Sequence, residues 1–482
     1  MRFRLRPTIA ALAAGTAAAA VSAAFASAAT GPGEAEMLVK IADTTAISDL
    51  AYREDAYLSD VIGPRLSGSS QDAAAVAYVA DRMRALGLAV RLEPVMVPDW
   101  VRGEESASLV NWAHRPAGDT QKIVVTALGT SVATPPQGIT APVVVVHGFD
   151  ELATLGARVR GAIVLYDVPF DKRLAAAGEG GDAYGEVIGY RSRGPSAAAK
   201  LGAVASLVRS LGSADDRLPH TGLTHYAAGI AKIPAGAVTT EDAELIARLA
   251  QRGPVTMHLT LTPRTLPDAK TDNVIADLPG TGSPACSVIV SGHLDSWDLG
   301  TGATDDGAGV AEAMSAMATL HDLAVKPRCT IRFIAYANEE SGQRGGATYA
   351  RDETARLGTI VVAIESDSGA AMPIGFGTSL SAAAAPALEP IAAALRTIGA
   401  PVIEYGIGSE TDVEPLALAS VPVFAPVQHD PKYFDYHHTA ADTFDKVDKA
   451  GIAQNAAVLA TLAYGLSQAA PGVAREPYGA DR

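Results

Sequence analysis

Several common catalytic signatures are absent from this chain of 482 residues. It has no GxSxG motif, which argues against a serine hydrolase, and no HExxH motif, which argues against a zincin. A GxxxxGK[ST] phosphate-binding loop is also missing. The sequence GTG at residues 300–302 does not continue into a dinucleotide-binding fingerprint, so we interpret it as a flexible loop.

The composition is poor in aromatic residues, at 5%, and in charged residues, at 19%, whereas 48% of the residues are hydrophobic. These values are those of a globular protein whose core is rich in alanine, valine and leucine. The sequence also lacks long runs of like charge, low-complexity tracts and internal repeats. At this length we expect two or three domains with sizeable cores.

The N-terminal segment differs from the rest of the chain. Three arginines in MRFRLR precede an uncharged stretch from Pro7 to Gly33, and ASA at residues 26–28 fits a cleavage site. This layout predicts a secretory signal peptide over residues 1–28, with an uncleaved membrane anchor as the alternative. Cleavage removes the three arginines and changes the net charge from −15 to −18. We therefore expect an acidic periplasmic or extracellular protein that binds neither nucleic acid nor membrane.

Cysteine is scarce, with Cys286 and Cys329 only. Each stands at the start of an apolar run that is predicted to be a strand, CSVIVSG and CTIRFIAYA. If the two strands are parallel neighbours, the sulfurs can meet in a disulfide, which an oxidising compartment permits. Two buried thiols are the alternative.

The pattern of predicted elements changes twice along the chain. Helical and extended segments alternate up to about residue 110 and again from about residue 272. Between them, short β runs and Gly- or Pro-rich turns dominate, with one predicted helix at GPSAAAKLG. Strands that alternate with helices predict a mostly parallel sheet covered on both faces. We therefore predict a discontinuous α/β domain over residues 35–120 and 264–472, interrupted by a smaller β-rich insert over residues 121–263.

Acidic residues and histidines follow the predicted strands of the second α/β segment. In chain order they are His293, Asp295, Asp305, Asp306, Glu339, Glu340, Asp367 and His438. Each one alone has an ordinary explanation, such as a turn, a helix cap or an exposed charge. Together they collect beyond the carboxyl ends of the strands, where α/β proteins place their chemistry. Because packing so many carboxylates without a cation is costly, the pattern predicts two divalent metals.

The residue types also indicate which chemistry the metals would support. Imidazole and carboxylate ligands without thiolate favour catalytic Zn²⁺, with Mn²⁺ or Co²⁺ as substitutes. One carboxylate that bridges two metals leaves a position for a shared water nucleophile. An unligated carboxylate nearby can move the proton of that water to a leaving amine, which suits the pair Glu339 and Glu340. Asp295, two residues after His293, is placed to orient its imidazole.

The motifs HxD, DDGAG, EE, SD and HTxADT together resemble the co-catalytic di-zinc exopeptidases, a family of aminopeptidases and glutamate carboxypeptidases. Four longer stretches narrow the resemblance to the carboxypeptidase Q branch of this family and its bacterial members. They are GPRLSGS, RLEPVMVPDWVRGEES, SGHLDSWDLGTGATDDG and YFDYHHTAADT. The resemblance extends over essentially the whole chain after the N-terminal segment.

This resemblance implies a three-layer α/β/α zinc-exopeptidase domain with a mixed sheet, interrupted by a protease-associated domain over residues 121–263. It also implies two Zn²⁺ per chain, with ligand assignments as follows: His293 and Asp367 for one, Glu340 and His438 for the other, and Asp305 as the bridge. By the same resemblance, Glu339 is the general base and Asp295 is the acid that orients His293. No ligand position is missing, which argues against an inactive homologue and against the single-zinc glutaminyl cyclases.

Substrate contacts are less well defined by the resemblance. His437, next to the ligand His438, is predicted to contact substrate, with a structural role as the alternative. Asp412 lies in GSETDVEPL, which resembles a loop near the substrate pocket of the family, and is a second candidate. The resemblance places the insert beside the catalytic cleft, where Tyr190 or Arg191 in YRSRG either reaches a substrate or belongs to a turn.

We therefore expect an exported di-zinc exopeptidase, with a homodimer implied by the resemblance, that hydrolyses dipeptides or short peptides with free termini. A broad-specificity aminopeptidase of the same family is the alternative, because the ligand set does not decide which peptide end is recognised. A catalytically silent, metal-stabilised peptide-binding protein is an alternative of another class. The presence of Glu339 argues against it, because a binding site has no use for an unligated acid.

Overall fold

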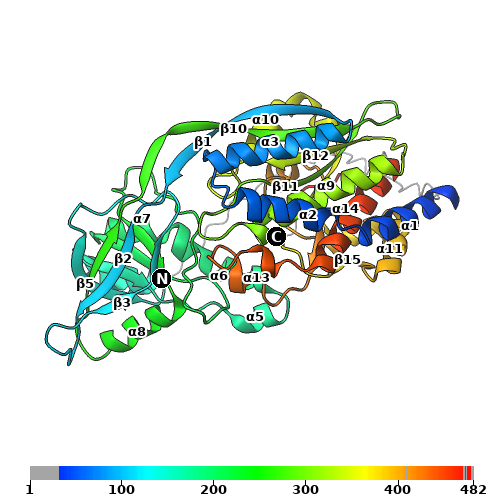
Figure 1. The fold of residues 1–482 in the computed structure, drawn as a ribbon. Helices are drawn as coiled ribbons and strands as arrows, with labels where there is room; N and C mark the ends of the chain where they lie inside the picture. The colour runs from blue at the N-terminus through cyan, green and yellow to red at the C-terminus, as the bar shows by residue number, and fades with distance from the viewer. Residues whose placement is uncertain (1–31, 409–410, 470–472, 474, 479–482) are drawn as a thin grey trace, which may run out of the picture.

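The computed structural model describes residues 32–408, 411–469, 473 and 475–478. The described residues form two eight-stranded sheets that lie side by side (Figure 1). The long strands β1 (Ala89–Val101) and β10 (Arg264–Leu278) pair antiparallel along their length and lead from one sheet to the other. The predicted signal peptide, residues 1–28, lies outside the described residues.

The first sheet has the order β1-β10-β12-β11-β13-β16-β14-β15. Its central strands are parallel, whereas the pairs β1/β10, β10/β12 and β14/β16 are antiparallel. Its other strands are β11 (Ser287–His293), β12 (Thr330–Tyr336), β13 (Ile360–Glu365), β14 (Pro373–Thr378), β15 (Val402–Tyr405) and β16 (Val423–Gln428). Strands β14 and β15 were not predicted, because PIGFGT begins with proline and holds two glycines, which weakens its β signal.

Helices cover both faces of this first sheet, which confirms the predicted three-layer α/β/α fold class. Strand residues such as Val290 and Phe333 pack into one large core with five helices, and Ile289 and Ile334 pack on the opposite face. The five helices are α1 (Pro32–Ala46), α3 (Ser70–Ala85), α9 (Ala308–Asp322), α11 (Ala385–Leu395) and α14 (Lys449–Ala469). Those on the other face are α10 (Arg344–Asp352) and α12 (Glu414–Leu418).

Shorter helices complete the connections of this region. Helix α2 (Leu50–Ala56) packs on α9, and α13 (Tyr433–Tyr436) precedes the two adjacent histidines. Single π or 3₁₀ turns are η1 (Tyr57–Ile62), η2 (Gly156–Val159), η3 (Ala303–Gly307), η4 (Thr354–Thr359), η5 (Ala382–Ala384), η6 (Arg396–Ile398) and η7 (Phe444–Lys446). Of the described helices, none is both long and apolar enough to cross a lipid bilayer.

The second sheet has the order β3-β2-β9-β5-β6-β7-β8-β4. It consists of β2 (Glu105–Asn111), β3 (Gln121–Ile123), β4 (Val125–Ala127), β5 (Ile139–Val146), β6 (Ile163–Tyr166), β7 (Ala205–Arg209), β8 (Ala235–Val238) and β9 (Thr256–Leu261). The predicted insert begins at residue 121, but β2 pairs with β3 and β9. By its pairing, β2 therefore belongs to the second sheet, which starts about 15 residues earlier than predicted.

Helices also flank the second sheet, and more of them than the sequence indicated. Four pack on one face and one on the other: α4 (Phe149–Leu155), α5 (Lys172–Ala176), α6 (Gly180–Ser192) and α7 (Gly194–Lys200), opposite α8 (Thr240–Ala250). Only α7 was predicted. The interpretation of YRSRG as a turn was wrong, since Tyr190 and Arg191 lie within α6, whose four glycines weaken its helical pattern.

The two regions are held together by polar and apolar contacts. Arg102, at the junction of β1 and β2, donates two hydrogen bonds of 2.9 and 2.7 Å to Oδ1 of Asp298. Trp297, which follows β11, is buried in the core of the second sheet. Phe434 of α13 packs among the helices of the insert. These contacts fix the second sheet and its helices against the edge of the first sheet where its parallel strands end.

A disulfide joins Cys286 to Cys329. The two cysteines directly precede β11 and β12, which are parallel neighbours with Ser287 opposite Thr330. The strand pairing considered from the sequence is therefore the one that the structure has, and the alternative of two buried thiols is wrong. The disulfide lies at the end of these strands opposite to the predicted metal ligands.

Candidate active site

All five predicted metal ligands meet beyond the carboxyl ends of the central strands. His293 is the last residue of β11, and Asp305 lies in η3, the turn that leads into α9. Glu340 follows β12, Asp367 follows β13, and His438 follows α13. Parallel strands bring their carboxyl ends to one edge of a sheet, which explains why residues so distant in sequence converge.

The carboxylate of Asp305 lies between two groups of side chains. Its Oδ1 is 3.2 Å from Nε2 of His293, which in turn is 3.5 Å from Oδ1 of Asp367. Its Oδ2 is 3.2 Å from Nε2 of His438, which is 3.1 Å from Oε2 of Glu340. Asp305 therefore presents one oxygen to each group, as a carboxylate that bridges two cations must.

The adjacent Asp306 has a different role, which the sequence did not distinguish. Its Oδ2 accepts a hydrogen bond from the backbone N–H of His293, and its Oδ1 accepts one from the N–H of Gly309. Both of its oxygens thus tie the end of β11 to the start of α9. In contrast, Oδ2 of Asp305 is buried without a hydrogen-bond partner. An orphaned buried carboxylate oxygen facing histidine and glutamate fits a metal site.

His293 and His438 shift the pKa of the carboxyl group of Asp305. Burial alone would raise the pKa of Asp305, but the imidazoles of His293 and His438 beside its two oxygens outweigh it and hold this pKa well below its usual range. In turn, burial would lower the pKa of His293 and the nearby carboxylates raise it well above its usual range. Concentrated negative charge therefore dominates the site, and a cation would be strongly attracted to it.

The two residues of the Glu339–Glu340 pair lie in different environments. Glu340 faces His438, and its Oε1 lies 3.3 Å from the backbone N–H of Trp297. Glu339 accepts a hydrogen bond from Nε2 of Gln343. It belongs to none of the three groups of described side chains that are close enough to hold a metal ion, which are His220, His437 and His438; His293, Asp306 and Asp367; and Asp305, Glu340 and His438. Burial raises the pKa of Glu339 well above its usual range, and the charges of Asp367 and Glu340 add to the rise. A carboxyl with a raised pKa is suited to accept and return a proton near neutral pH.

Asp295 orients its neighbours differently from the prediction. Nδ1 of His293 lies 2.9 Å from the backbone carbonyl oxygen of Asp295, whereas the carboxylate is 3.9 Å away. The carboxylate instead accepts hydrogen bonds from the hydroxyl of Ser67 and from the backbone N–H of Glu339. Asp295 therefore fixes the imidazole through its main chain and the Glu339 loop through its side chain.

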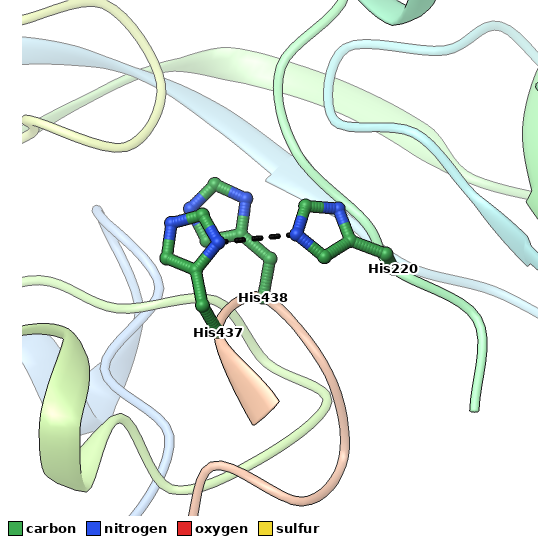
Figure 2. A group of neighbouring side chains, drawn as sticks. All are labelled: His220, His437 and His438. Carbon is green, nitrogen blue, oxygen red and sulfur yellow. Dashed lines mark hydrogen bonds between the residues drawn. The ribbon is translucent and has the colours of Figure 1, made fainter. Parts of the chain in front are cut away.

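His437 lies against His438, a predicted metal ligand, with the two stacked ring centroids 3.8 Å apart. Its Nδ1 is hydrogen bonded at 3.1 Å to Nε2 of His220, which comes from the loop between β7 and β8 in the insert. Figure 2 shows the three imidazoles together, with His220 reaching in from a separate segment. Burial lowers the pKa of both His220 and His437 well below the usual range, so both rings are neutral near pH 7. His220 was not among the predicted site residues, because no local pattern around it indicates a contact with His437.

Asp412, the other predicted substrate contact, is in a different position. Its side chain has 0% exposure and accepts a hydrogen bond from the backbone N–H of Gly346 in α10. A side chain without exposed surface does not contact a substrate in this conformation. The prediction at Asp412 was therefore wrong, and its neighbour Thr411 lines the cavity instead.

Arg65 is a fully buried residue of the site whose role the sequence did not reveal. Its guanidinium donates hydrogen bonds of 2.7 to 2.8 Å to the backbone carbonyls of Leu294, Thr301 and Gly302. These carbonyls belong to the loop between β11 and η3, which carries Asp295 and Asp305. Arg65 thus holds the shape of the loop that presents the bridging carboxylate.

A cavity of about 500 Å³, the catalytic cavity, opens over the ligands. Both regions line it. The first region contributes Asp305, Glu339, Glu340, Gly342, Gln343, Asp367, Thr411, Tyr433, Phe434, His437 and His438, and the insert contributes Tyr184, Ile188, Arg191, Ser192, Leu223 and His225. Tyr190 packs instead with Phe149 and Tyr166 in the core of the insert. Of the two residues that the sequence proposed in YRSRG, only Arg191 reaches the cavity.

Known proteins resemble the chain in sequence and in fold. Residues 273–463 match the sequence pattern of Peptidase family M28. Carboxypeptidase Q of Homo sapiens is 35% identical over 433 residues, which are 89% of this chain and 88% of the human protein. Aminopeptidase YwaD of Bacillus subtilis is 26% identical over 301 residues, 62% of this chain and 56% of the relative.

Solved structures agree with these sequence matches. A Peptidase M28 precursor from Shewanella amazonensis superimposes with a TM-score of 0.84 at 35% identity, over 92% of this chain and 99% of that one. A zinc aminopeptidase from Bacillus subtilis shares the fold, with a TM-score of 0.64 at 20% identity over 88% and 97% of the two chains. With the ligand cluster at its strand ends, this chain belongs to peptidase family M28 and is a metallopeptidase with carboxypeptidase Q relatives.

Proposed function

We propose that this metallopeptidase is an exopeptidase that holds two zinc ions and hydrolyses dipeptides or short peptides with free termini. The observation that carries the proposal is the position of Asp305, whose two oxygens face two separate groups of ligands. In the proposed assignment, His293 and Asp367 hold one ion, Glu340 and His438 hold the other, and Asp305 bridges them. Nitrogen and oxygen donors in these numbers suit Zn²⁺.

The remaining residues of the site suit the reaction itself. Bound there, the two ions would supply an activated water and polarise the scissile carbonyl. Glu339, buried beside the ligands with a raised pKa, accepts the proton of the attacking water and returns it to the leaving amine. Asp295 holds the Glu339 loop through the backbone N–H of Glu339. His437 is held by His220 with its Nε2 toward Asp305, 3.5 Å away, where it can donate to a substrate oxygen.

We further propose that residues 102–263 are a protease-associated insert within the peptidase domain. Support comes from strand pairing, because the chain leaves the first sheet after β1 and returns to it with β10. Export to the periplasm or the medium is proposed from the N-terminal sequence pattern and agrees with the Cys286–Cys329 disulfide. We also propose a homodimer, which is implied by the resemblance to the family. Size-exclusion chromatography with light scattering tests this oligomeric state.

An aminopeptidase of the same family is the second candidate. It is favoured by relatives with that printed name, among them the aminopeptidase of Bacillus subtilis. The two candidates share their chemistry and differ in which end of the peptide the cavity recognises. They therefore differ in the substrates cleaved and not in metal content.

Zinc content and cleavage, measured on the same preparation, test the proposal. The purified protein is analysed for zinc per chain and then assayed on a dipeptide panel and on chromogenic aminoacyl amides, with and without chelator. The expected result is about two ions per chain and dipeptide cleavage that the chelator abolishes. Preference for the aminoacyl amides would favour the aminopeptidase, and two bound ions without any cleavage would contradict both enzymes.

A further inference from the structure

A second cavity, of about 320 Å³, adjoins the catalytic cavity. Asp367 and Thr411 line both cavities. The second cavity lies at the carboxyl ends of β13 and β16, and the insert reaches it with Gly178. A Cβ at Gly178 would lie 2.9 Å from Cβ of His429, so the insert packs closely against this wall. A substrate bound beside Asp367 can therefore extend a side chain into the second cavity.

The charged groups of the second cavity are acidic. Glu365, Asp367 and Glu404 line it, and no lysine or arginine among the described residues does. Asp367 is a proposed metal ligand, so the carboxyl groups of Glu365 and Glu404 remain for a bound molecule. Nε2 of His429 lies 3.6 Å from Oε1 of Glu404, which is beyond hydrogen-bonding distance. The second cavity thus favours a positively charged occupant.

Two buried oxygens of this cavity lack a hydrogen-bond donor. Glu365 is only 2% exposed, and its Oε2 accepts a hydrogen bond from the backbone N–H of Val413. Its Oε1 is buried without a hydrogen-bond partner. Oε1 of Gln428 is also buried without a partner, whereas Nε2 of this residue donates to the carbonyl of Gly369. Buried acceptors are nearly always satisfied, so two unsatisfied acceptors on one cavity indicate an occupant that donates hydrogen bonds.

Much of the remaining wall is apolar. Five hydrophobic side chains line the second cavity, namely Ile407, Val413, Val423, Phe424 and Val427. A lysine or arginine side chain has both features that such a cavity matches, because its methylene stem packs on apolar surface and its charged end reaches polar groups. A volume of about 320 Å³ also holds a whole side chain, whereas an amino group alone would leave the apolar wall uncovered.

Charge indicates which residue of the substrate enters the second cavity. In a dipeptide, the residue before the cut bond carries the positive α-amino group, and the residue after it carries the negative carboxylate. Glu365 and Glu404 attract the first of these groups and repel the second. The side chain that enters the cavity is therefore the one that belongs to the residue before the cut bond.

We infer that the second cavity binds the cationic side chain of a lysine or arginine that precedes the cut bond, with Glu404 as a specificity-determining residue. The inference rests on the proposed exopeptidase function and names its preferred substrates. It applies to a dipeptidase and to an aminopeptidase alike, since both bind the residue before the cut bond. Glu404 is the carboxylate to test, because Glu365 is only two residues from the proposed ligand Asp367.

A comparison of Lys-Ala with norleucyl-alanine tests the inference, because norleucine has the stem of lysine without its ammonium group. The wild type should cleave Lys-Ala with a kcat/KM roughly tenfold higher. It should show no such preference for Ala-Lys over alanyl-norleucine. In Glu404→Gln, cleavage of Lys-Ala should fall by roughly fivefold and that of norleucyl-alanine by less than about twofold, since a carboxylate that is 41% exposed makes a modest ion pair.

Glu389→Gln is the matched control. Glu389 lies on α11, is 59% exposed and does not line the second cavity, so this variant has the same change in net charge. It should match the wild type on both peptides. Glu404→Lys should reverse the preference, so that norleucyl-alanine is cleaved faster than Lys-Ala. The preference of the wild type should also decrease as salt is added, because Glu404 is partly exposed.

Binding gives a readout that does not depend on turnover. Reduced dipeptide analogues of Lys-Ala and norleucyl-alanine, with CH₂–NH in place of the peptide bond, are titrated calorimetrically into the metal-loaded protein. Zinc content and thermal unfolding are measured for every variant, and the comparison of the two peptides in the wild type does not depend on any variant.

The outcomes separate the inference from the proposed function. Equal cleavage of Lys-Ala and norleucyl-alanine by the wild type would overturn the inference and leave the proposed function intact. Equal losses on both peptides in Glu404→Gln would also overturn it. If the wild type cleaves neither peptide yet binds the lysine analogue roughly tenfold more tightly, the inference stands and the proposed function fails.

Discussion

The two regions that meet at the catalytic cavity differ in the kind of polar group they bring to it. The first region brings three carboxylates and two histidines that face one another within hydrogen-bonding distance, and Glu339 beside them. The insert brings a cation, a phenol and a neutral histidine, namely Arg191, Tyr184 and His220. One set has an excess of negative charge that attracts cations, whereas the other carries a positive charge.

We interpret this difference as a separation between the residues proposed to cleave the bond and residues of the insert that can contact the substrate. Metal ligands need rigid positions, and the strand ends of a buried sheet provide them. Groups that contact a substrate can lie on a separate unit, provided that this unit is fixed against the first. Here the contacts of Arg102, Trp297 and Phe434 fix the two regions against each other. The predictions below test whether the two sets of residues can be changed independently.

The largest effect is expected from Asp305→Asn, which changes the residue shared by both ligand groups. The neutral amide should weaken both metal sites, so zinc content should fall and activity should drop to background. Atomic absorption on the purified variant and dipeptide assays check this result. Full metal occupancy in this variant would remove Asp305 from the bridging position. Asp306→Asn should also affect folding, because the two carboxylate oxygens of Asp306 accept hydrogen bonds from the backbone N–H groups of His293 and Gly309.

Glu339→Gln should separate chemistry from metal binding within the first region. We expect roughly 10²- to 10⁴-fold loss of kcat, since only the proton acceptor is removed. Zinc content and affinity for the reduced dipeptide analogue should stay near wild-type values. Activity retained within a few fold would show that another group takes the proton.

His220→Phe tests whether the insert also influences the reaction itself. Loss of the hydrogen bond to His437 should cost about 1 kcal/mol, or roughly fivefold in kcat/KM, equally for Lys-Ala and norleucyl-alanine. Such uniform loss would distinguish His220, which acts through His437, from Glu404. His258→Phe, on β9 of the insert and away from the cavity, is the matched control. A loss confined to Lys-Ala would contradict a role through His437 and connect His220 with the second cavity.

The smallest effect on activity is expected from removing the disulfide. Cys286→Ala with Cys329→Ala should lower the free energy of unfolding by about 2–4 kcal/mol, because the bond closes a loop with a sequence separation of 43 residues. Activity per folded molecule should remain at the wild-type level, since the bond lies at the far ends of β11 and β12. Urea unfolding and assays below the transition measure both quantities. A change in activity at full folding would mean that the strands transmit strain to the site.

The sequence predicted some parts of the fold and of the site correctly and missed others, and both regions contain elements of each kind. The convergence of His293, Asp305, Glu340 and Asp367 was predictable because they lie at or beyond the ends of apolar strands, and parallel strands end at one edge of a sheet. His438 follows helix α13 and was identified through the HTxADT motif. Strand β14 and helix α6 were missed because both are rich in glycine, which weakens their local sequence pattern. Helix α8 carried a signal that was overlooked, since Thr239 caps it by accepting from the N–H of Asp242.

Other features of the site depend on tertiary contacts that no local pattern reveals. The contacts of Arg65, His220 and Arg191 follow from what the folded chain places beside them, up to 247 residues away in the case of Arg191 and His438. Asp295 and Asp412 show the reverse case. Their types and positions suggested direct roles, but packing turned the carboxylate of Asp295 toward Ser67 and enclosed Asp412 completely.

The antiparallel pair β1 and β10 has a consequence for the order in which the molecule folds. Its register joins Val101 to Arg264, so residues 102–263 must be spanned before the edge of the first sheet can close. Closing such a long flexible loop is slow and entropically costly, but a folded insert shortens the effective loop because β2 and β9 already lie side by side. The folded insert thereby brings β1 and β10 into register. Substitutions that destabilise the core of the insert would therefore slow the folding of the first region, although they change none of its residues.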